Sequence, residues 1–486
     1  MTTRKQSLQS SQPWKPRKTQ MLAMKFLIEH ACAGLFLKPG RGKTSVALGA
    51  LEFLRKRGML KRTLVVAPVR VCHSVWPREI AKWSEFSHLR TVILHGPDKD
   101  ARLQEDADIY LINYEGLEWL LDAKRIGKRT MQVDLTKLED LKIDLIIFDE
   151  LSKMKNGTSN RFQAMAQALH LFGRRWGLTG SPASNGLIDL WGQCYTLDMG
   201  RSLSPYITNF RNTYFYVDRS GYNYTLIPGM EDAIYKRIAP LVLQQDDDKS
   251  GMPSLSDNVI MIDLPERAME TYRRLEKDLL VAVNENIITA ATAATASMKV
   301  RQIAAGGIYL DKEPGKGANQ PRRWENLHME KVDALVDLVD ELQGQPLLVG
   351  YEFEHDLDRL KKAFPKACYV ADLTPAQFDK VVDQWNRGEI PLLIGHPASM
   401  GHGLNLQGAG RDVCFLSPGW NFELFDQFIR RVWRPGNTHK KVTVHHLIAA
   451  GTIEERIFAV LRSKDSTQNA LFAALKQLAR EKRNAR

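Results

Sequence analysis

Short runs of apolar residues recur along two stretches of the chain, and each run is followed by a turn and a segment with helical spacing. The runs lie at 64–67, 109–112, 145–148 and 176–179 in the first stretch, and at 347–349, 392–394, 413–416 and 442–444 in the second. Continuous apolar runs are typical of strands covered on both faces, as in parallel sheets flanked by helices. The pattern therefore predicts an α/β protein with two doubly wound parallel sheets.

The pattern changes between the two stretches, from about residue 201 to residue 323. Residues 282–296 are rich in alanine and favour a helix, residues 244–257 are polar with an acidic run, and residues 314–323 have the composition of a loop. We expect helical insertions here, together with the connection between the two sheets. The last residues, 476–486, are basic and form a tail that is either helical or disordered.

The length and composition are those of a globular protein with more than one core. The chain has 486 residues and no apolar stretch long enough to span a membrane. Its first 20 residues are polar and basic, which is not typical of a secretory signal. The five cysteines are scattered and none forms a CxxC pair, so neither a disulfide framework nor a zinc site is indicated. We expect a reduced, intracellular protein that is not secreted.

The charge balance adds a hint about partners. Lys and Arg total 68 against 56 Asp and Glu, a net charge of +12. Such an excess attracts a polyanion through counterion release. Basic proteins without any nucleic-acid role are about as common, so charge alone does not choose between the two.

A glycine-rich turn suggests a phosphate-binding loop. Residues 40–44 read GRGKT; they follow the apolar run 34–37 and precede a helix-like segment. Backbone N–H groups at such a strand-to-helix turn face an anion, so Lys43 is expected to reach the β- and γ-phosphates and Thr44 to bind Mg²⁺. Position 37 is leucine where the full GxxxxGK[ST] pattern has glycine. A chance turn of this composition is therefore the alternative.

Two adjacent carboxylates follow a buried run about a hundred residues later. Asp149 and Glu150 come directly after the run 145–148. Carboxylates at the end of a buried strand are costly unless a cation or a proton meets them. Asp149 is expected to hold Mg²⁺ and Glu150 to orient the attacking water. The alternative, a strand end facing solvent, would be preferred without the Lys43 loop upstream.

Three polar residues near the C-terminus are spaced for one helical face. Gln427, Arg431 and Arg434 stand at i, i+4 and i+7 in a segment that is predicted to be helical up to Pro435. Two arginines on one face suit the γ-phosphate of a nucleotide bound in the other half of the chain. A solvated basic helix is the alternative.

Read in order, these segments resemble the SWI/SNF-type branch of the superfamily-two helicases. The resemblance covers about residues 14–457. Its segments are KPRKTQ ending at Gln20, 36–45, VVAPVRVCHSVW at 65–76, INYE at 112–115, DELSKMKN at 149–156, LTGSPASNGLIDLW at 178–191, VGY at 349–351, GHGLNLQ at 401–407, 427–436 and TIEERI at 452–457.

The resemblance implies two tandem RecA-like lobes that use ATP and Mg²⁺. It assigns residues 1–200 to lobe 1, 201–325 to helical insertions and the inter-lobe linker, 326–462 to lobe 2 and 463–486 to a basic tail. It makes Gln20 the reader of the adenine edge and implies catalytic roles for Lys43, Asp149, Glu150, Arg431 and Arg434. Further nucleotide contacts are implied for Gly40, Gly42, Thr44, Ser45 and Gln427, with Thr44 and Asp149 on the metal. Nucleic-acid or coupling roles are implied for Thr179, Ser181, Gly401, Gly403 and Asn405.

The implied activity is that of an ATP-dependent motor that tracks the backbone of duplex or forked DNA without sequence preference. We expect a monomer with no membrane association, in a bacterial or phage-infected cytoplasm or in a eukaryotic nucleus, recruited by a protein that the sequence does not identify. The chain departs from the family at DELS, which replaces DEAH, and at Ser181, where threonine is common. Alternatives are a strand-separating helicase, an RNA-dependent ATPase and a clamp that binds ATP without hydrolysing it.

Overall fold

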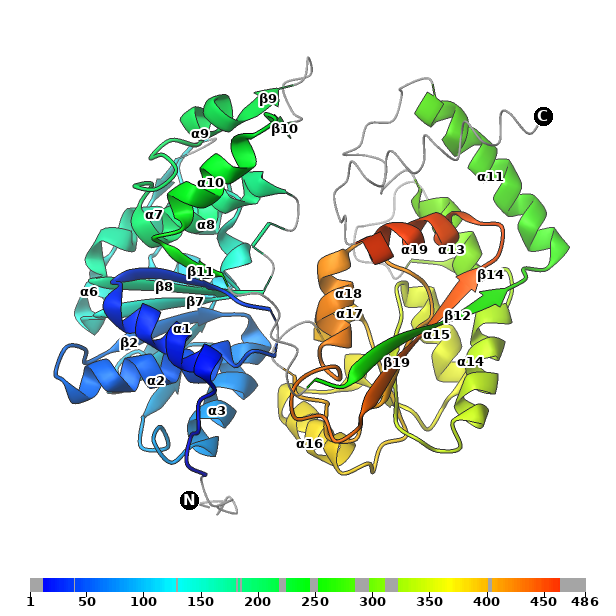
Figure 1. Cartoon of the computed structure of the whole chain (residues 1–486), viewed down its shortest axis with the longest axis horizontal. Coiled ribbons are helices and arrows are strands. Elements are labelled where there is room, and N and C mark those ends of the chain that lie inside the picture. The colour runs from blue at the N-terminus through cyan, green and yellow to red at the C-terminus, as the bar shows by residue number, and fades with distance from the viewer. Residues whose placement is uncertain are drawn as a thin grey trace. The chain divides into compact units, whose positions relative to one another are not determined.

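The computed structural model describes residues 12–38, 40–127, 130–180, 182–183, 186–217, 224–244, 252–284, 297–310, 322–400 and 404–463. The chain divides into two compact units, residues 1–248 and residues 249–486, each built around its own sheet (Figure 1). Expectations for the acidic run 246–248, most of the loop 314–323, most of the segment 282–296 and the tail after residue 463 fall outside the described residues.

The first unit contains a seven-stranded, wholly parallel sheet. Its order is β11 (Val242–Gln244), β1 (Cys32–Phe36), β8 (Arg174–Thr179), β7 (Leu145–Asp149), β2 (Thr63–Ala67), β4 (Ile109–Asn113) and β3 (Thr91–Ile93). The four apolar runs predicted as strands in this half are confirmed. The short strands β3 and β11 at the two edges were not predicted.

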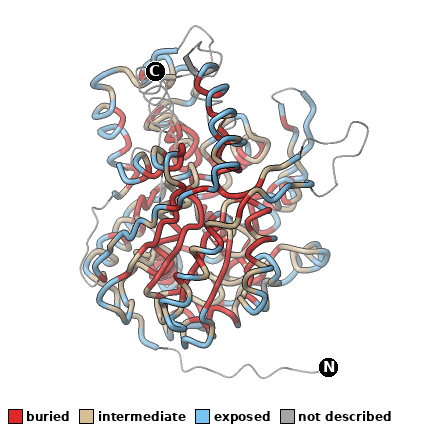
Figure 2. The backbone as a smooth tube through the Cα atoms, turned by 90° about the vertical axis from the view of Figure 1, so that its right-hand side faces the viewer, coloured by how far each residue is buried: buried red, intermediate tan, exposed pale blue. Residues whose placement is uncertain are grey.

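Alternate residues of these strands enter separate cores on the two faces of the sheet. In β2, Val65 and Ala67 belong to one core and Leu64 and Val66 to the other. The first core is closed by α1 (Lys18–Glu29), α2 (Lys43–Lys56) and α3 (Trp76–Lys82), and the second by α7 (Asn160–Ala168), α8 (Leu190–Asp198), α9 (Ile207–Tyr214) and α10 (Met230–Ile238). Figure 2 shows the buried backbone following the strands. Burial on both faces explains the continuous apolar runs.

The second unit repeats the plan with six parallel strands. Their order is β12 (Ser254–Ile262), β19 (Lys441–Ala449), β18 (Asp412–Phe415), β15 (Leu347–Gly350), β17 (Leu392–Gly395) and β16 (Cys368–Tyr369). Helices α14 (Glu330–Glu341) and α15 (Glu354–Ala363) pack in the core on one face. Helices α16 (Pro375–Asn386) and α18 (Phe422–Ile429) pack in the core on the other. The four runs predicted as strands here are confirmed, so the chain has the two-sheet α/β fold expected from its apolar pattern.

The region between the predicted sheets contributes more than helices. It contains α9, α10, α11 (Glu266–Asn284) and α13 (Met298–Ala305), and it also supplies β11 to the first sheet and β12 to the second. Two antiparallel hairpins accompany the helices, β9 (Phe215–Val217) with β10 (Tyr224–Leu226), and β13 (Gly307–Tyr309) with β14 (Trp324–Asn326). The polar composition of β12 concealed it, since it is an edge strand whose residues are mostly exposed.

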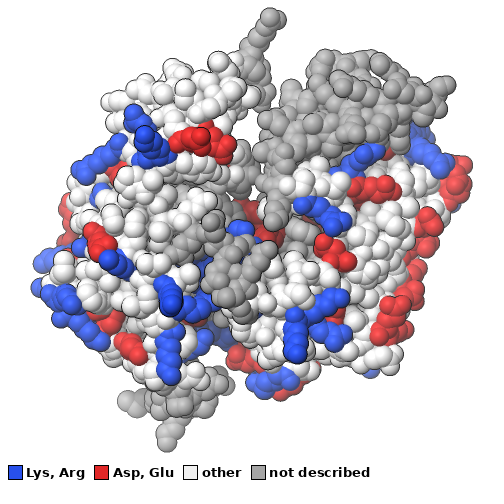
Figure 3. Space-filling view, viewed as in Figure 1, with Lys and Arg blue, Asp and Glu red and all other residues white. Residues whose placement is uncertain are grey.

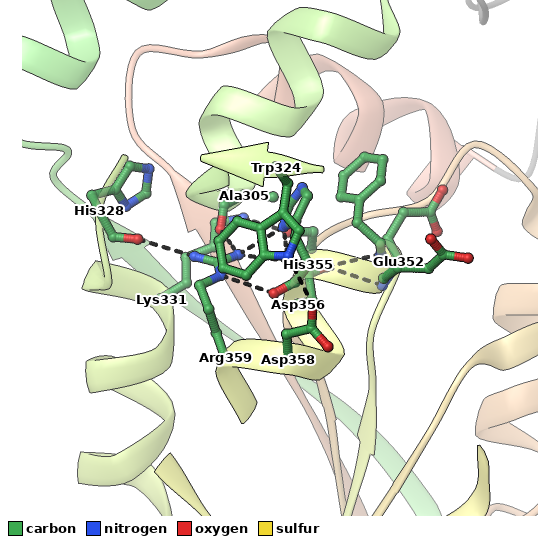
Figure 4. Close-up of polar contacts among 12 residues, drawn as sticks. Ala305, Trp324, His328, Lys331, Glu352, His355, Asp356, Asp358 and Arg359 are labelled. Atoms are coloured by element: carbon green, nitrogen blue, oxygen red, sulfur yellow. Dashed lines mark hydrogen bonds and ion pairs between the residues drawn. The ribbon is translucent and has the colours of Figure 1, made fainter. Parts of the chain in front are cut away.

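A buried polar network ties α13 and the β13–β14 hairpin to α15 in the second unit (Figure 4). The guanidinium of Arg359 donates to the backbone oxygens of Ala305 (2.7 Å) and His328 (3.0 Å) and to Asp356 Oδ1 (2.7 Å). An exposed bond adds to this network, since the Trp324 indole donates to Asp358 Oδ2 at 2.8 Å. Both Arg359 and Asp356 are almost fully buried, so this cation and anion compensate each other inside the protein.

Charge is unevenly distributed on the face in Figure 3. Acidic side chains gather over α14, whose exposed residues include Asp333, Asp337, Asp340 and Glu341. Lysines and arginines are more frequent on the visible surface of the first unit. Within the described ranges, no helix combines the length and the apolar character needed to cross a membrane.

Candidate nucleotide and nucleic-acid site

The loop between β1 and α2 is shaped by two glycines. Gly40 and Gly42 have φ angles of +82° and +75°, in the left-handed region that glycine adopts without strain. The Lys43 ammonium donates to the backbone oxygen of Leu37 at 2.7 Å, so the loop folds around it. Lys43 is also the first residue of a 14-residue helix, where free N–H groups and the helix dipole favour an anion. The geometry fits a phosphate group.

Gln20 lies against this loop, although it is more than 20 residues away in sequence. Its Nε2 donates to the backbone oxygen of Arg41 at 3.3 Å, and its Oε1 accepts from the Arg17 backbone N–H at 2.9 Å. A Cβ atom placed on Gly42 would lie only 2.4 Å from Gln20 Nε2. The structure therefore brings Gln20 and the phosphate loop together, as the adenine-reading role requires.

The first turn of α2 carries the two hydroxyls expected near the nucleotide. Ser45 is buried, and its Oγ donates to the backbone oxygen of Gly42 at 3.0 Å. That bond holds the loop from within. Thr44 is half-buried one residue earlier, between Lys43 and Ser45.

The acidic pair and Thr179 lie at the same edge of the first sheet. Asp149 ends β7 opposite Leu178 of β8, and Thr179 ends β8 opposite Phe36 of β1. The Leu37 N–H donates to the Thr179 backbone oxygen at 3.1 Å, which joins the phosphate loop to the end of β8. Ser181, the other expected coupling residue in this segment, lies outside the described residues.

Burial dominates the electrostatics of Asp149. The net pKa of this carboxyl is raised to about 6. Burial and the neighbouring Glu150 carboxylate raise the pKa, whereas the Trp76 hydrogen bond, the Lys43 charge and the Glu150 backbone N–H lower it. The Trp76 indole Nε1 donates to Asp149 Oδ2 at 2.9 Å. A partly desolvated carboxylate favours the approach of a cation, and a carboxylate and a hydroxyl oxygen, as on Asp149 and Thr44, are ligand types that suit Mg²⁺.

Glu150 has an unusual backbone conformation for its residue type. Its φ of +64° is left-handed, which costs a residue with a side chain roughly 1–3 kcal/mol unless the surroundings enforce it. The Tyr114 hydroxyl provides part of that enforcement, because it lies 3.0 Å from the Asp149 backbone oxygen and 3.1 Å from that of Glu150. Ser152 Oγ donates to Glu150 Oε1 at 3.1 Å. The turn that follows β7 is therefore held from two sides.

Sequence reasoning did not identify Trp76 or Tyr114 as individual site residues. Both fall in segments that resemble family motifs, 65–76 and 112–115, and that was the only signal available. Their contacts with the acidic pair depend on the order of β7, β2 and β4 in the sheet.

The arginine segment of the second unit differs from its prediction. Helix α18 ends at Ile429, so the expectation of one helical face from Gln427 to Arg434 is wrong. The chain tightens after the helix, with Arg431 N donating to Phe428 O and Val432 N to Ile429 O, both at 3.1 Å. Pro435 disfavours helical geometry only for Arg434, so it does not account for an end at Ile429.

The two arginines nevertheless converge on one backbone oxygen. Arg431 and Arg434 both donate to Leu404 O, at 3.5 and 3.2 Å, and Arg434 also contacts Asn405 Oδ1. Arg431 Nε donates to the backbone oxygen of Gln427 at 3.0 Å. The expected residues Gln427, Arg431, Arg434 and Asn405 thus form one cluster. Gly401 and Gly403, expected beside them, lie outside the described residues.

A cavity of about 140 Å³ lies at the carboxyl edge of the second sheet. It is lined by residues that follow β15, β17 and β18, among them Tyr351, Glu352, His396 and Trp420. Trp420 also packs against the core formed by α11, α13 and α19 (Ile453–Ser463). Its side chain therefore serves both core packing and the cavity wall.

Family models of known proteins match most of the chain. A family model described as the SNF2-related domain matches residues 20–313, and one described as the helicase conserved C-terminal domain matches residues 330–436. A phage protein with the provisional name p41, from Acyrthosiphon pisum secondary endosymbiont phage 1, is 34% identical over 481 residues, which cover 95% of this chain and 99% of the relative.

More distant relatives are longer proteins. The DNA repair and recombination protein RAD54 of Saccharomyces cerevisiae is 21% identical, over 91% of this chain and 53% of its own length. The CHD3-type chromatin-remodeling factor PICKLE of Arabidopsis thaliana is 24% identical, over 90% of this chain and 32% of its own length.

The solved SWI2/SNF2 ATPase core of Sulfolobus solfataricus in complex with dsDNA is 21% identical, covers 97% of this chain and 96% of that chain, and gives a TM-score of 0.43.

Proposed function

The chain belongs to the SNF2-related family of helicase-like ATPases, and from that premise we propose that it hydrolyses MgATP to move along duplex DNA. One observation carries the proposal. Gln20, the Lys43 loop, Asp149 and Thr179 meet at the carboxyl edge of the first sheet, which is where nucleotides bind in open α/β sheets.

The residues of this edge divide the work of phosphoryl transfer. Lys43 exchanges its bond to Leu37 O for the β- and γ-phosphate oxygens. Thr44 and Asp149 would hold Mg²⁺, which when bound would neutralise charge on the transferred phosphoryl group. Glu150, fixed by its backbone and by Ser152, orients the attacking water.

Arg431 and Arg434 supply the remaining positive charge in this proposal. Guanidinium groups suit phosphate oxygens because their donors form a rigid fork. Arginines that act on a γ-phosphate typically contribute roughly 10³–10⁵ in rate. Their shared contact with Leu404 O and the neighbouring Asn405 keeps the two side chains together.

DNA is the proposed track because relatives such as RAD54 are named for DNA repair and recombination. Segments 65–76, 112–115, 349–351 and 404–407 are proposed to contact the phosphate backbone. Such contacts confer affinity without sequence reading, so binding should weaken steeply with salt. The acidic surface of α14 is unsuited to nucleic acid and is assigned no contact.

The decisive experiment measures ATP turnover with no polymer, duplex DNA, single-stranded DNA and RNA. Duplex DNA should stimulate turnover, and Lys43→Ala and Arg434→Ala should remove most of it. Lys25→Ala and Arg387→Ala are matched controls, since each removes an exposed cation that pairs with a nearby surface carboxylate, Glu29 or Glu389. Turnover that ignores every polymer would reject the motor, and stimulation by RNA alone would reject the DNA assignment.

Two alternatives remain separable from translocation by further readouts. Release of a labelled strand from forked and blunt duplexes would identify a strand-separating helicase. Tight ATP and DNA binding without any phosphate release would identify a clamp.

A further inference from the structure

Two buried aromatic side chains connect the acidic pair to segments that follow neighbouring strands. The Trp76 side chain is fully buried, and its indole N–H donates to Asp149 Oδ2 at 2.9 Å. Tyr114 is also buried, with its hydroxyl 3.0 and 3.1 Å from the backbone oxygens of Asp149 and Glu150. Trp76 therefore contacts the carboxylate of Asp149, and Tyr114 contacts the backbone of both Asp149 and Glu150.

Both aromatic residues belong to segments at the edge of the sheet. Trp76 directly follows a five-residue π-helix, Val71–Val75, and its backbone N–H donates to Val71 O. Short π-helical turns are frequent at functional sites. Tyr114 directly follows β4, beside Asn113, whose side chain donates to Glu115 at 2.9 Å. Each segment therefore has a buried donor directed at the acidic pair.

These contacts restrict how far Asp149 and Glu150 can move independently of the segments that carry Trp76 and Tyr114. A carboxylate accepts through about four lone-pair sites, so a donor on Oδ2 orients the group and leaves room for a cation. Partners behind a metal ligand set its orientation in this way, and their loss typically lowers metal affinity or activity about 10–100-fold. The left-handed backbone of Glu150 makes its turn sensitive to the Tyr114 bond.

We propose that Trp76 and Tyr114 are positioning residues for the metal-binding carboxylate of Asp149, and that through them DNA on segments 65–76 and 112–115 strengthens Mg²⁺–nucleotide binding. The inference rests on the function proposed above. Coupling between two binding sites is reciprocal, so Mg²⁺–nucleotide must strengthen DNA binding by the same factor. A shift of either segment moves a donor on which the acidic pair depends.

The test measures binding, not turnover. A fluorescent ADP analogue is titrated with Mg²⁺, with and without duplex DNA, on the full chain. Trp76→Phe should raise the Mg²⁺ concentration at half-saturation about tenfold to a hundredfold, and DNA should no longer lower it. Trp176→Phe is the matched control, because Trp176 is equally buried in the same unit and its indole donates to a distant backbone oxygen, that of His30, at 3.2 Å.

A second pair of variants tests the other contact. Tyr114→Phe removes only a hydroxyl and should reduce the DNA effect severalfold. Tyr110→Phe is its control, since Tyr110 is buried in β4 and its hydroxyl donates to Glu105 O at 2.8 Å, away from the acidic pair. Thermal unfolding establishes that each variant is folded. If Trp76→Phe is not, the benzothiophene analogue of tryptophan at position 76 keeps the ring shape and removes the donor.

The outcomes separate this proposal from the proposed function. Trp76 variants that keep the wild-type Mg²⁺ half-saturation and the wild-type DNA effect would overturn the positioning role, while DNA-stimulated turnover would still stand. Wild-type protein whose nucleotide binding and turnover both ignore DNA would reject the motor and the coupling together. A Trp76-specific loss of both the Mg²⁺ affinity and the DNA effect supports the proposal.

Discussion

Gly42→Ala tests the nucleotide site because the added Cβ atom has two separate effects: it strains the backbone and it collides with Gln20. The left-handed backbone of Gly42, with φ +75°, costs a residue with a side chain roughly 1–2 kcal/mol. The new Cβ would also lie 2.4 Å from Gln20 Nε2. The atom in conflict is the end of a flexible side chain, so Gln20 would move and lose its contact with Arg41 O.

Gly58→Ala separates the two penalties. Gly58 follows the other end of α2, has a φ of +68°, and has nothing within 4 Å of an added Cβ. Both variants should therefore lose a similar 1–2 kcal/mol, roughly, from the stability of the first unit. Only Gly42→Ala should also displace Gln20, the residue proposed to read adenine.

The discriminating measurement is the ratio of ATP to GTP affinity, because any general damage to the phosphate loop weakens both nucleotides alike. If Gln20 makes two hydrogen bonds to adenine at about 1 kcal/mol each, losing them lowers the preference for ATP about thirtyfold. Gly58→Ala should leave the ratio unchanged, and Gln20→Ala should reproduce the loss. A Gly42→Ala protein that keeps the wild-type ratio would refute the reasoning.

Three further outcomes are expected. Glu454→Gln should destabilise the second unit by about 3–5 kcal/mol in chemical denaturation, since it leaves the fully buried Lys331 ammonium without its carboxylate at 2.5 Å; the paired change Lys331→Met with Glu454→Leu should recover most of that loss. Burial lowers the pKa of His328 to about 4, so the unfolded chain binds a proton first as the pH falls. Unfolding free energy should therefore drop between about pH 6.5 and pH 4, by up to about 3 kcal/mol, and His328→Gln should flatten this limb while His439→Gln should not. Duplex DNA affinity should fall linearly in a log–log plot against salt, and a slope near zero would contradict backbone binding.

The strands could be predicted wherever both faces of the sheet are covered. Runs such as 145–148 are apolar at every position because each residue enters one of two cores. Strand β12 escaped prediction because it lies at the edge of its sheet, and most of its polar residues and even most of its apolar ones are exposed. The apolar pattern of a sequence reflects burial. An edge strand buries too few of its residues to give a clear apolar pattern.

The candidate site was predictable where chemistry is local in sequence. The Lys43 loop and the Asp149–Glu150 pair can each be recognised from a few consecutive residues. Arg431 and Arg434 were expected to lie together on one helical face, but α18 ends at Ile429, and their shared contact with Leu404 was not predicted. Trp76 could not be assigned because its contact with Asp149 spans 73 positions and depends on the folding of the sheet.

The position of β11 has a consequence for how this fold can change. The segment holding α9, α10 and the β9–β10 hairpin leaves the first sheet after β8 and returns as β11, which pairs with β1 through Gly34 and Val242. Strand β1, which leads into the Lys43 loop, is thus braced by a parallel neighbour on each side. Long additions between such anchors cost little closure entropy. Additions within this segment would leave the pairing of β1 with β8 and β11 unchanged, and with it the sheet edge that we propose binds the nucleotide.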